Sequence, residues 1–218
     1  MSAFRHFVNR IKIRLRGKYQ IVGWRMTPDE VVAFFKQQEK TVLTFFGFSG
    51  FQYDEEPEVL EIARSVLSGY SPETTLVNIG VTSDGAGIIY PVAKEMGFRT
   101  TGIVSTRVMN HPHRISLAVD IICIVVDTVW GGIIPGTNTL SPTSQAMIAC
   151  SDILVAIGGG KISRDELIAA KEKGKTFQYF PAPMDRAWAI ARAKSKGMPP
   201  PESFDGEVHE WLENDTNP

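Results

Sequence analysis

The sequence predicts an α/β protein with a Rossmann-like, doubly wound fold, in which six largely parallel strands carry helices on both faces. Two observations predict it. Short apolar runs alternate with amphipathic helical segments from residue 41 to residue 196, and glycine-rich loops follow three of these runs. The run at residues 153–157 is continuously apolar, as a strand covered on both faces needs to be. In such sheets, ligands bind beyond the carboxyl ends of the strands.

Composition and charge restrict the class of protein. With 218 residues, of which 43% are hydrophobic, the chain can bury one full core. Its formal net charge of −1 gives no indication of a nucleic acid partner. No stretch is apolar and long enough to span a bilayer, and the N-terminus lacks a signal-peptide pattern, so we expect a cytoplasmic protein. Cys123 and Cys150 lie in apolar segments and are expected to be reduced core residues.

The first forty residues are expected to form a helical extension, residues 1–40. Residues 1–18 combine basic side chains with apolar residues at helical spacing, which predicts a basic amphipathic helix packed on its own domain. Thr27 favours the start of a second helix, because it is a good cap and a proline follows it. The extension is followed by a ligand-binding domain over residues 41–198 and a C-terminal tail over residues 199–218.

Strands and helices alternate through the predicted domain. Strands are predicted over residues 41–46, 75–79, 99–104, 120–126, 153–157 and 176–180. Helices are predicted over residues 56–67, up to residue 96, and over residues 142–150, 161–173, 185–196 and 207–212, most of them with a proline or glycine boundary signal. The segment of residues 127–141 is a candidate lid, because a loop of this length in a compact domain is usually functional or mobile.

Glycine-rich loops follow the first, second and fifth predicted strands and define the candidate site. Without Cβ atoms, glycines let backbone amides approach an anion, and the following helix directs the positive end of its dipole to the same place. We therefore expect these loops to bind a phosphate or carboxylate. The expected binding residues are Gly47, Ser49, Gly50, Gly80, Thr82, Ser83, Gly85, Gly87, Gly158, Gly159, Gly160, Ser163 and, after the third strand, Arg107.

The third glycine loop permits other interpretations. It is not a Walker A loop, because Ile162 stands where a magnesium-binding Ser or Thr is needed and Val155 where the first glycine is needed. Ser163 and Glu166 have the spacing of a capping box, in which each side chain binds the backbone amide of the other residue. Glu166 is therefore either a capping residue or a catalytic carboxylate.

This loop pattern resembles the LOG/SLOG superfamily over roughly residues 41–183. The resemblance implies a Rossmann-like fold and one of three functions found in that superfamily: cytokinin-activating phosphoribohydrolase, nucleotide-sensing domain or molybdenum cofactor carrier. It also implies a homodimer or a higher homo-oligomer. The matching positions are Gly47, Ser49, Gly50, Gly80, Gly85, Gly87, Ser151, Asp152, Gly159, Gly160, Ser163 and Glu166.

Departures from the hydrolase motif favour a binding protein. The hydrolases carry Pro-Gly-Gly-x-Gly-Thr-x-x-Glu, whereas Gly158 replaces the proline here and Ile162 the third glycine. Their Arg-Lys pair, which would hold a phosphate and a ribosyl transition state, is replaced at about that position by Thr143 and Ser144. We therefore expect a carrier for a nucleotide or a molybdopterin-type cofactor.

Three alternatives remain. The first is a nucleoside monophosphate phosphoribohydrolase, with Glu166 as the catalytic carboxylate and Arg107 or Arg164 holding the phosphate. The second is an NAD oxidoreductase, which is weaker because the first loop is not Gly-x-Gly-x-x-Gly and an asparagine ends the second strand where a ribose-binding acid belongs. The third is a metal enzyme, which is weaker still because no carboxylate or cysteine is spaced to join His111 and His113. No metal site is expected.

Overall fold

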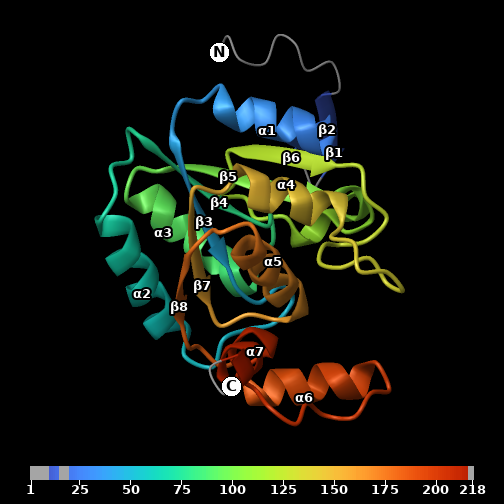
Figure 1. Cartoon of the computed structure of the whole chain (residues 1–218). Coiled ribbons are helices and arrows are strands. Elements are labelled where there is room, and N and C mark those ends of the chain that lie inside the picture. The colour runs from blue at the N-terminus through green and yellow to red at the C-terminus, as the bar shows by residue number, and fades with distance from the viewer. Residues whose placement is uncertain (1–9, 15–19, 216–218) are drawn as a thin grey trace.

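One mostly parallel sheet organises the part of the chain that the structure describes (Figure 1). The computed structural model describes residues 10–14 and 20–215. The strand order is β1-β2-β6-β5-β4-β3-β7-β8, and all neighbours are parallel except β1 and β2. The strands are β1 (Arg10–Arg14), β2 (Gln20–Met26), β3 (Thr41–Phe46), β4 (Thr75–Ile79), β5 (Arg99–Ser105), β6 (Ile121–Val125), β7 (Ile153–Ile157) and β8 (Phe177–Phe180). The predicted α/β class is confirmed, whereas the predicted count of six strands is wrong, because this sheet has 8.

Helices cover both faces of the sheet, as predicted. Buried side chains of α1, α4, α5 and α7 form one apolar core, and those of α2, α3 and α6 belong to a second core on the opposite face (Figure 1). The helices are α1 (Pro28–Lys36), α2 (Glu56–Ser68), α3 (Ile89–Glu95), α4 (Pro142–Cys150), α5 (Lys161–Glu172), α6 (Arg186–Ser195) and α7 (Glu207–Asp215). None of the helices in the described ranges combines the length and apolar character that crossing a bilayer requires.

The continuous apolar run of β7 serves both cores at once. Val155 and Ile157 point to the core that contains α2 and α3, while Leu154 and Ala156 point to the other core. Successive side chains of a strand face opposite sides of the sheet, so a strand covered on both faces needs apolar residues at every position. This confirms the argument from which the parallel sheet was predicted.

The helix expected over residues 1–18 is wrong wherever the structure describes it. β1 pairs antiparallel with β2, which pairs parallel with β6 and so extends the main sheet. In β1, Ile13 is buried while Arg10 and Lys12 are exposed, which is the two-residue period of a strand with one covered face. Residues 1–9 and 15–19, on which the rest of that prediction falls, lie outside the described residues.

Most other elements form at nearly the predicted positions. Thr27 caps α1 through a capping box with Glu30, as its sequence indicates. The predicted helix that ends near residue 96 begins as a 3₁₀ turn, η1 (Gly85–Ile88), before α3. The segment expected as a C-terminal tail contains α7, whose Val208 is fully buried in the core, so this segment contributes to the packed structure.

Candidate ligand-binding site

The three glycine loops meet at the carboxyl edge of the sheet. β3 lies between β4 and β7, so the loops that follow these three strands are neighbours. The Ala86 amide donates a 2.9 Å hydrogen bond to the Phe48 carbonyl, which joins the second loop to the first. The Ser163 hydroxyl donates a 2.8 Å hydrogen bond to the Gly47 carbonyl, which joins the first loop to α5. The three loops are therefore connected to one another at this edge, as expected for neighbouring parallel strands.

Asp84 connects the first two loops through hydrogen bonds. Its Oδ1 atom accepts a 2.8 Å hydrogen bond from the Gly50 amide and a second, short one from the Thr82 hydroxyl. The side chains of Ser49 and Ser83, in the same two loops, are exposed. A Cβ on Gly80 would have no heavy atom within 4 Å. Hydroxyl groups and a glycine backbone are thus accessible to a ligand here.

Gly85 and Gly87 are explained by crowding within the protein. A Cβ on Gly85 would overlap the carbonyl of Phe48, and a Cβ on Gly87 would overlap the carbonyl of Thr82. Both residues are buried. These glycines therefore allow the second loop to pack against the first, whatever binds at the surface that the loops form.

The glycine loop before α5 is covered by the protein's own C-terminal segment. A Cβ on Gly159 would lie 2.8 Å from Cγ2 of Val208, and the Val208 amide donates a 3.2 Å hydrogen bond to the Gly159 carbonyl. A Cβ on Gly158 would lie 2.9 Å from the ring of Phe48 and would overlap the carbonyl of Ala182. An anion was predicted to bind beside Gly159, but the side chain of Val208 fills this space.

The capping box predicted for α5 is wrong. Gly160 is the N-cap residue of this helix and makes no side-chain cap. Ser163 instead donates to Gly47, and Glu166 accepts a 2.6 Å hydrogen bond from the hydroxyl of Ser144 in α4. The spacing of Ser163 and Glu166 fits a capping box. However, both side chains form hydrogen bonds with other elements, Ser163 with the first loop and Glu166 with α4.

Glu166 is a buried carboxyl group that is mostly protonated at neutral pH. The residue is only 5% exposed. Burial raises the pKa of its carboxyl group from 4.5 to about 8, the hydrogen bond from Ser144 opposes this, and the nearby carboxylate of Asp165 adds to it. A carboxyl group in this state is largely shielded from solvent and carries little charge at pH 7.

The long loop of residues 127–141 is attached to the two helices that carry Ser144 and Asp165. The Gly132 amide donates a 2.7 Å hydrogen bond to Oγ of Ser144, and the Ile133 amide donates a 3.0 Å hydrogen bond to Oδ2 of Asp165. The other oxygen of Asp165 is engaged by Arg164 at 2.8 Å, so Arg164 lies against α5 and does not reach toward the first two loops. The start of the predicted lid is therefore attached to α4 and α5, while its tip, residues 135–139, is exposed.

Basic residues gather at the first two loops and at Trp130. Arg107, which was predicted as a binding residue, is exposed, and its guanidinium lies 5.6 Å from the centroid of the Trp130 ring. Arg114 lies 5.9 Å from the same centroid, and Arg192 donates a hydrogen bond to the carbonyl of Gly50. Sequence analysis missed Arg114 and Arg192, because nothing in their local pattern links them to a glycine loop far away in the chain.

His111 and His113 belong to this neighbourhood as aromatic groups. The ring centroids of His111 and Trp130 are 5.5 Å apart, and those of the two histidines are 6.1 Å apart. Within residues 10–14 and 20–215, no three His, Cys, Asp or Glu side chains come together in a way that could hold a metal ion.

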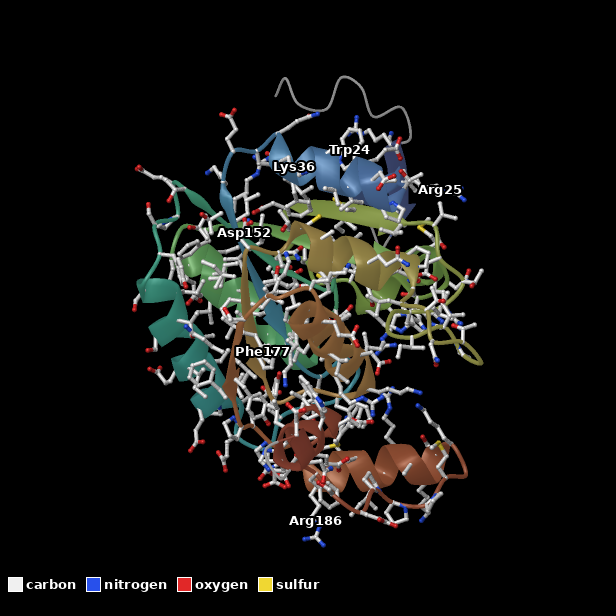
Figure 2. The ribbon with its side chains drawn as sticks, in the orientation of Figure 1. Trp24, Arg25, Lys36, Asp152, Phe177 and Arg186 are labelled. Carbon is white, nitrogen blue, oxygen red and sulfur yellow. The ribbon has the colours of Figure 1, made fainter. Side chains whose placement is uncertain are left out.

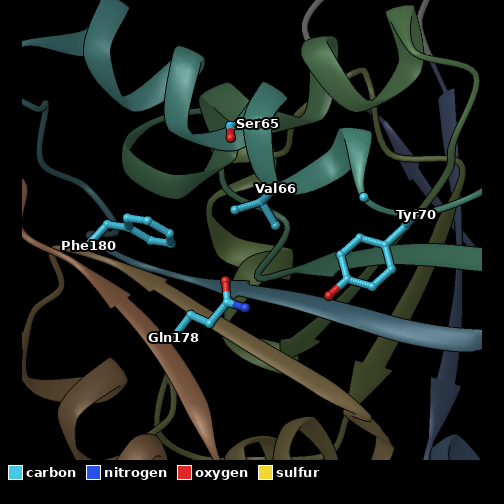
Figure 3. A pocket seen from close by; sticks show the side chains of 6 residues that line it. Ser65, Val66, Tyr70, Gln178 and Phe180 are labelled. Carbon is cyan, nitrogen blue, oxygen red and sulfur yellow. The ribbon is translucent and has the colours of Figure 1, made fainter.

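Two hollows lie away from the glycine loops. One, of about 340 Å³, lies between α2 and β8 and is lined by Ser65, Val66, Gly69, Tyr70, Gln178 and Phe180 (Figure 3). The other, of about 460 Å³, lies between α1 and the start of β3, where Lys36 and Asp152 contribute to its lining (Figure 2). Neither is lined by a residue of the three glycine loops.

Comparison with known proteins yields similarity of fold alone. No family model and no curated protein matches the sequence. Two structures of the Moco carrier protein from Chlamydomonas reinhardtii match with TM-scores of 0.46 and 0.45 at 18% and 16% identity, each covering 82% of this chain and 99% of that one. The structure of TM1055 matches with a TM-score of 0.44 at 19% identity over 63% of this chain and 72% of that one. At this level of similarity, the likeness carries no argument about what this chain binds.

Proposed function

We propose that the protein binds a phosphate-bearing small molecule at the carboxyl edge of its sheet and carries it without hydrolysing it. The sequence resemblance to LOG/SLOG proteins suggests a nucleotide or a molybdopterin-type cofactor as this molecule. The observation that supports the proposal most is that Arg114 and Arg192 meet at Gly50, beside loops with accessible hydroxyl groups. Arg107 lies on the same Trp130 ring as Arg114. Guanidinium groups offer paired N–H donors that match phosphate oxygens, and hydroxyl groups add further donors.

The binding surface combines several groups that a phosphate prefers. The hydroxyls of Ser49 and Ser83 are exposed, Thr82 is half-buried beside them, and the backbone at Gly80 has open space above it. The sheet directs the carboxyl ends of its parallel strands to this edge, where ligands of open α/β sheets bind. The sequence resemblance also supports a homo-oligomer, and the composition a cytoplasmic location.

The state of Glu166 argues against the hydrolase alternative. Stabilising a positive charge that develops on a ribosyl group requires an ionised carboxylate in contact with the substrate. Glu166 is buried, its raised pKa leaves it mostly protonated at pH 7, and Ser144, its hydrogen-bond partner, also binds the amide of Gly132. Its neighbour on α4 is the hydroxyl of Ser144, where the hydrolases have a cation.

A thermal-shift experiment combined with product analysis tests this function. Phosphate-bearing ligands, among them the nucleoside monophosphates, are expected to raise the melting temperature, because they bind the native state, and no free base is expected to form. The parent nucleosides serve as controls without a phosphate. Release of free base that disappears in Glu166→Gln would favour the hydrolase, and an unchanged melting temperature with every phosphorylated compound would contradict the binding function.

A further inference from the structure

Two arginines from distant segments converge on the first glycine loop. Arg114 ends the 3₁₀ turn η3 (Pro112–Arg114), and Arg192 lies in α6. The position that a Cβ on Gly50 would take lies 3.0 Å from both terminal nitrogens of Arg192 and in direct contact with Nη2 of Arg114. The two guanidinium groups are therefore close neighbours above Gly50.

Aromatic rings and backbone contacts hold both arginines in place. The guanidinium of Arg192 lies 4.6 Å from the ring centroid of Phe51 and 5.0 Å from that of Trp188. Arg114 lies on Trp130, and its own carbonyl accepts a 2.9 Å hydrogen bond from the Ser83 amide. Guanidinium groups stacked on rings lose little further freedom when they bind an anion, so the pair is preorganised.

The charge of this pair is only partly balanced. Oδ2 of Asp84 lies 3.8 Å from Nη2 of Arg114, while its other oxygen is used by Gly50 and Thr82. Nε of Arg192 is buried and has no hydrogen-bond partner in the part of the chain that the structure describes. Burial and the nearby charge of Arg114 lower the pKa of Arg192, and Asp84 opposes this. An anion placed here would relieve the repulsion between two cations.

The start of α5 is a poorer place for a phosphate in this protein. Val208 fills the space beside Gly159, and a carboxylate oxygen of Glu207 lies 3.5 Å from the position of a Cβ on Gly160. A carboxylate near the positive end of the α5 dipole favours that helix and repels a second anion. Among residues 10–14 and 20–215, the carboxylate found beside Arg114 and Arg192 is that of Asp84.

We propose that the phosphate binds to Arg114 and Arg192 above Gly50, and that this subsite selects terminal phosphomonoesters. This inference rests on the proposed function and names the ligand class. Arg114 and Arg192 bring two positive charges to Gly50, which favours a dianion over a monoanion. Asp84 offsets part of this charge, and Arg107, on the same Trp130 ring as Arg114, adds to it. A phosphomonoester carries between one and a half and two negative charges at pH 7, whereas a phosphodiester carries one.

Methyl phosphate and dimethyl phosphate test this inference, because they differ by one methyl group and one charge. Dissociation constants are measured by calorimetry at pH 7.5 and constant, low ionic strength for the wild type, Arg114→Met, Arg192→Met and Arg192→Lys. Arg186→Met is the matched control, because it removes one cation from the same helix. The guanidinium of Arg186 lies over the ring of Phe204, and its side chain points away from the rest of the molecule (Figure 2). Circular dichroism and melting without ligand establish that each variant folds.

The wild type is expected to bind methyl phosphate about tenfold or more tightly than dimethyl phosphate. Arg114→Met and Arg192→Met are each expected to weaken methyl phosphate binding by about 10- to 100-fold, and Arg186→Met by less than about twofold. Arg192→Lys keeps the charge but loses the paired donors, and is expected to lie between the wild type and Arg192→Met.

Two other outcomes separate this inference from the proposed function. If the two methionine variants bind methyl phosphate as the wild type does, while Lys161→Met at the start of α5 binds it more weakly, the subsite is wrong and phosphate binding stands. If the wild type binds neither methyl phosphate nor any phosphorylated compound of the thermal-shift experiment, the proposed function itself is wrong.

Discussion

The hydroxyl of Ser144 donates a 2.6 Å hydrogen bond to Oε1 of Glu166 and accepts a 2.7 Å hydrogen bond from the amide of Gly132. This one side chain thus joins α4, α5 and the long loop. In hydrolases of the LOG/SLOG type, an Arg-Lys pair is expected at about this position. Because Ser144 brings no positive charge, burial dominates and raises the pKa of Glu166 to about 8.

The wild type is expected to lose stability as the pH rises from 5 to 8, and replacing Glu166 by glutamine is expected to remove this loss. The pKa of Glu166 is raised on folding, from 4.5 to about 8, so its contribution to stability is present below pH 4.5 and is lost as the pH rises to about 8. The free energy of unfolding of Glu166→Gln relative to the wild type is therefore expected to increase by roughly 3 kcal/mol from pH 5 to pH 8. Urea denaturation at both values measures it, and a difference that stays constant with pH would show that Glu166 is ionised in the native protein.

Removing the hydroxyl of Ser144 is expected to loosen the long loop. Ser144→Ala leaves the Gly132 amide and the Glu166 carboxyl without their partner, which is expected to lower the free energy of unfolding by about 1 to 3 kcal/mol. Hydrogen exchange at the Gly132 amide is expected to accelerate more than exchange in the strands. Ser65→Ala, the same change at an exposed position of α2, is the control and is expected to change stability by less than about 1 kcal/mol. Unchanged exchange at Gly132 would show that the loop is held by other contacts.

Gly159 and Val208 are expected to be energetically coupled. A Cβ on Gly159 would lie 2.8 Å from Cγ2 of Val208. The φ angle of Gly159 is +134°, so any other residue at this position would have a strained backbone. Gly159→Ala is expected to cost about 2 kcal/mol or more of stability, and part of this cost is expected to be recovered when Val208→Ala is added, with a coupling of about 1 kcal/mol. Gly80→Ala, where a Cβ meets nothing within 4 Å, is the control. Strictly additive costs would show that the contact with Val208 is unimportant.

Neutralising Asp84 is expected to strengthen anion binding. Asp84→Asn keeps an oxygen that can accept from the Gly50 amide but removes the negative charge beside Arg114. The affinity for methyl phosphate is expected to rise about threefold to fivefold at low ionic strength. Glu61→Gln, an equal change of charge on α2, is the control, and calorimetry measures both. A weaker affinity in a folded Asp84→Asn protein would mean that Asp84 orients Arg114 more than it competes with the ligand.

Much of the fold could be predicted from local patterns. The apolar run of residues 153–157 predicts a strand buried on both faces, and the glycine loops predict the edge at which three strands end. The strand β1 falls within the helix predicted for residues 1–18, because isolated apolar residues such as Ile11 and Ile13 fit both a period of two and a helical spacing in so short a segment. The strand β2 was not predicted. The strand order depends on tertiary pairing and has no local signal.

The candidate site was only partly predictable, for a related reason. Arg192 lies 142 residues from Gly50 in the chain and reaches it only because α6 folds back across the edge of the sheet. Ser163 and Glu166 have the spacing of a cap, yet both side chains are taken by partners on other elements. Local spacing predicts local contacts, whereas the contacts that define this site are tertiary.

Native mass spectrometry of the purified wild-type protein tests the central claim most directly. The instrument compares the mass of the folded protein with that of the unfolded chain, and fragmentation identifies what is released. We predict a bound small molecule that releases a phosphate fragment, present at one copy per chain. A protein without any bound mass, or one whose bound molecule contains no phosphate, would contradict the claim that this chain carries a phosphate-bearing ligand.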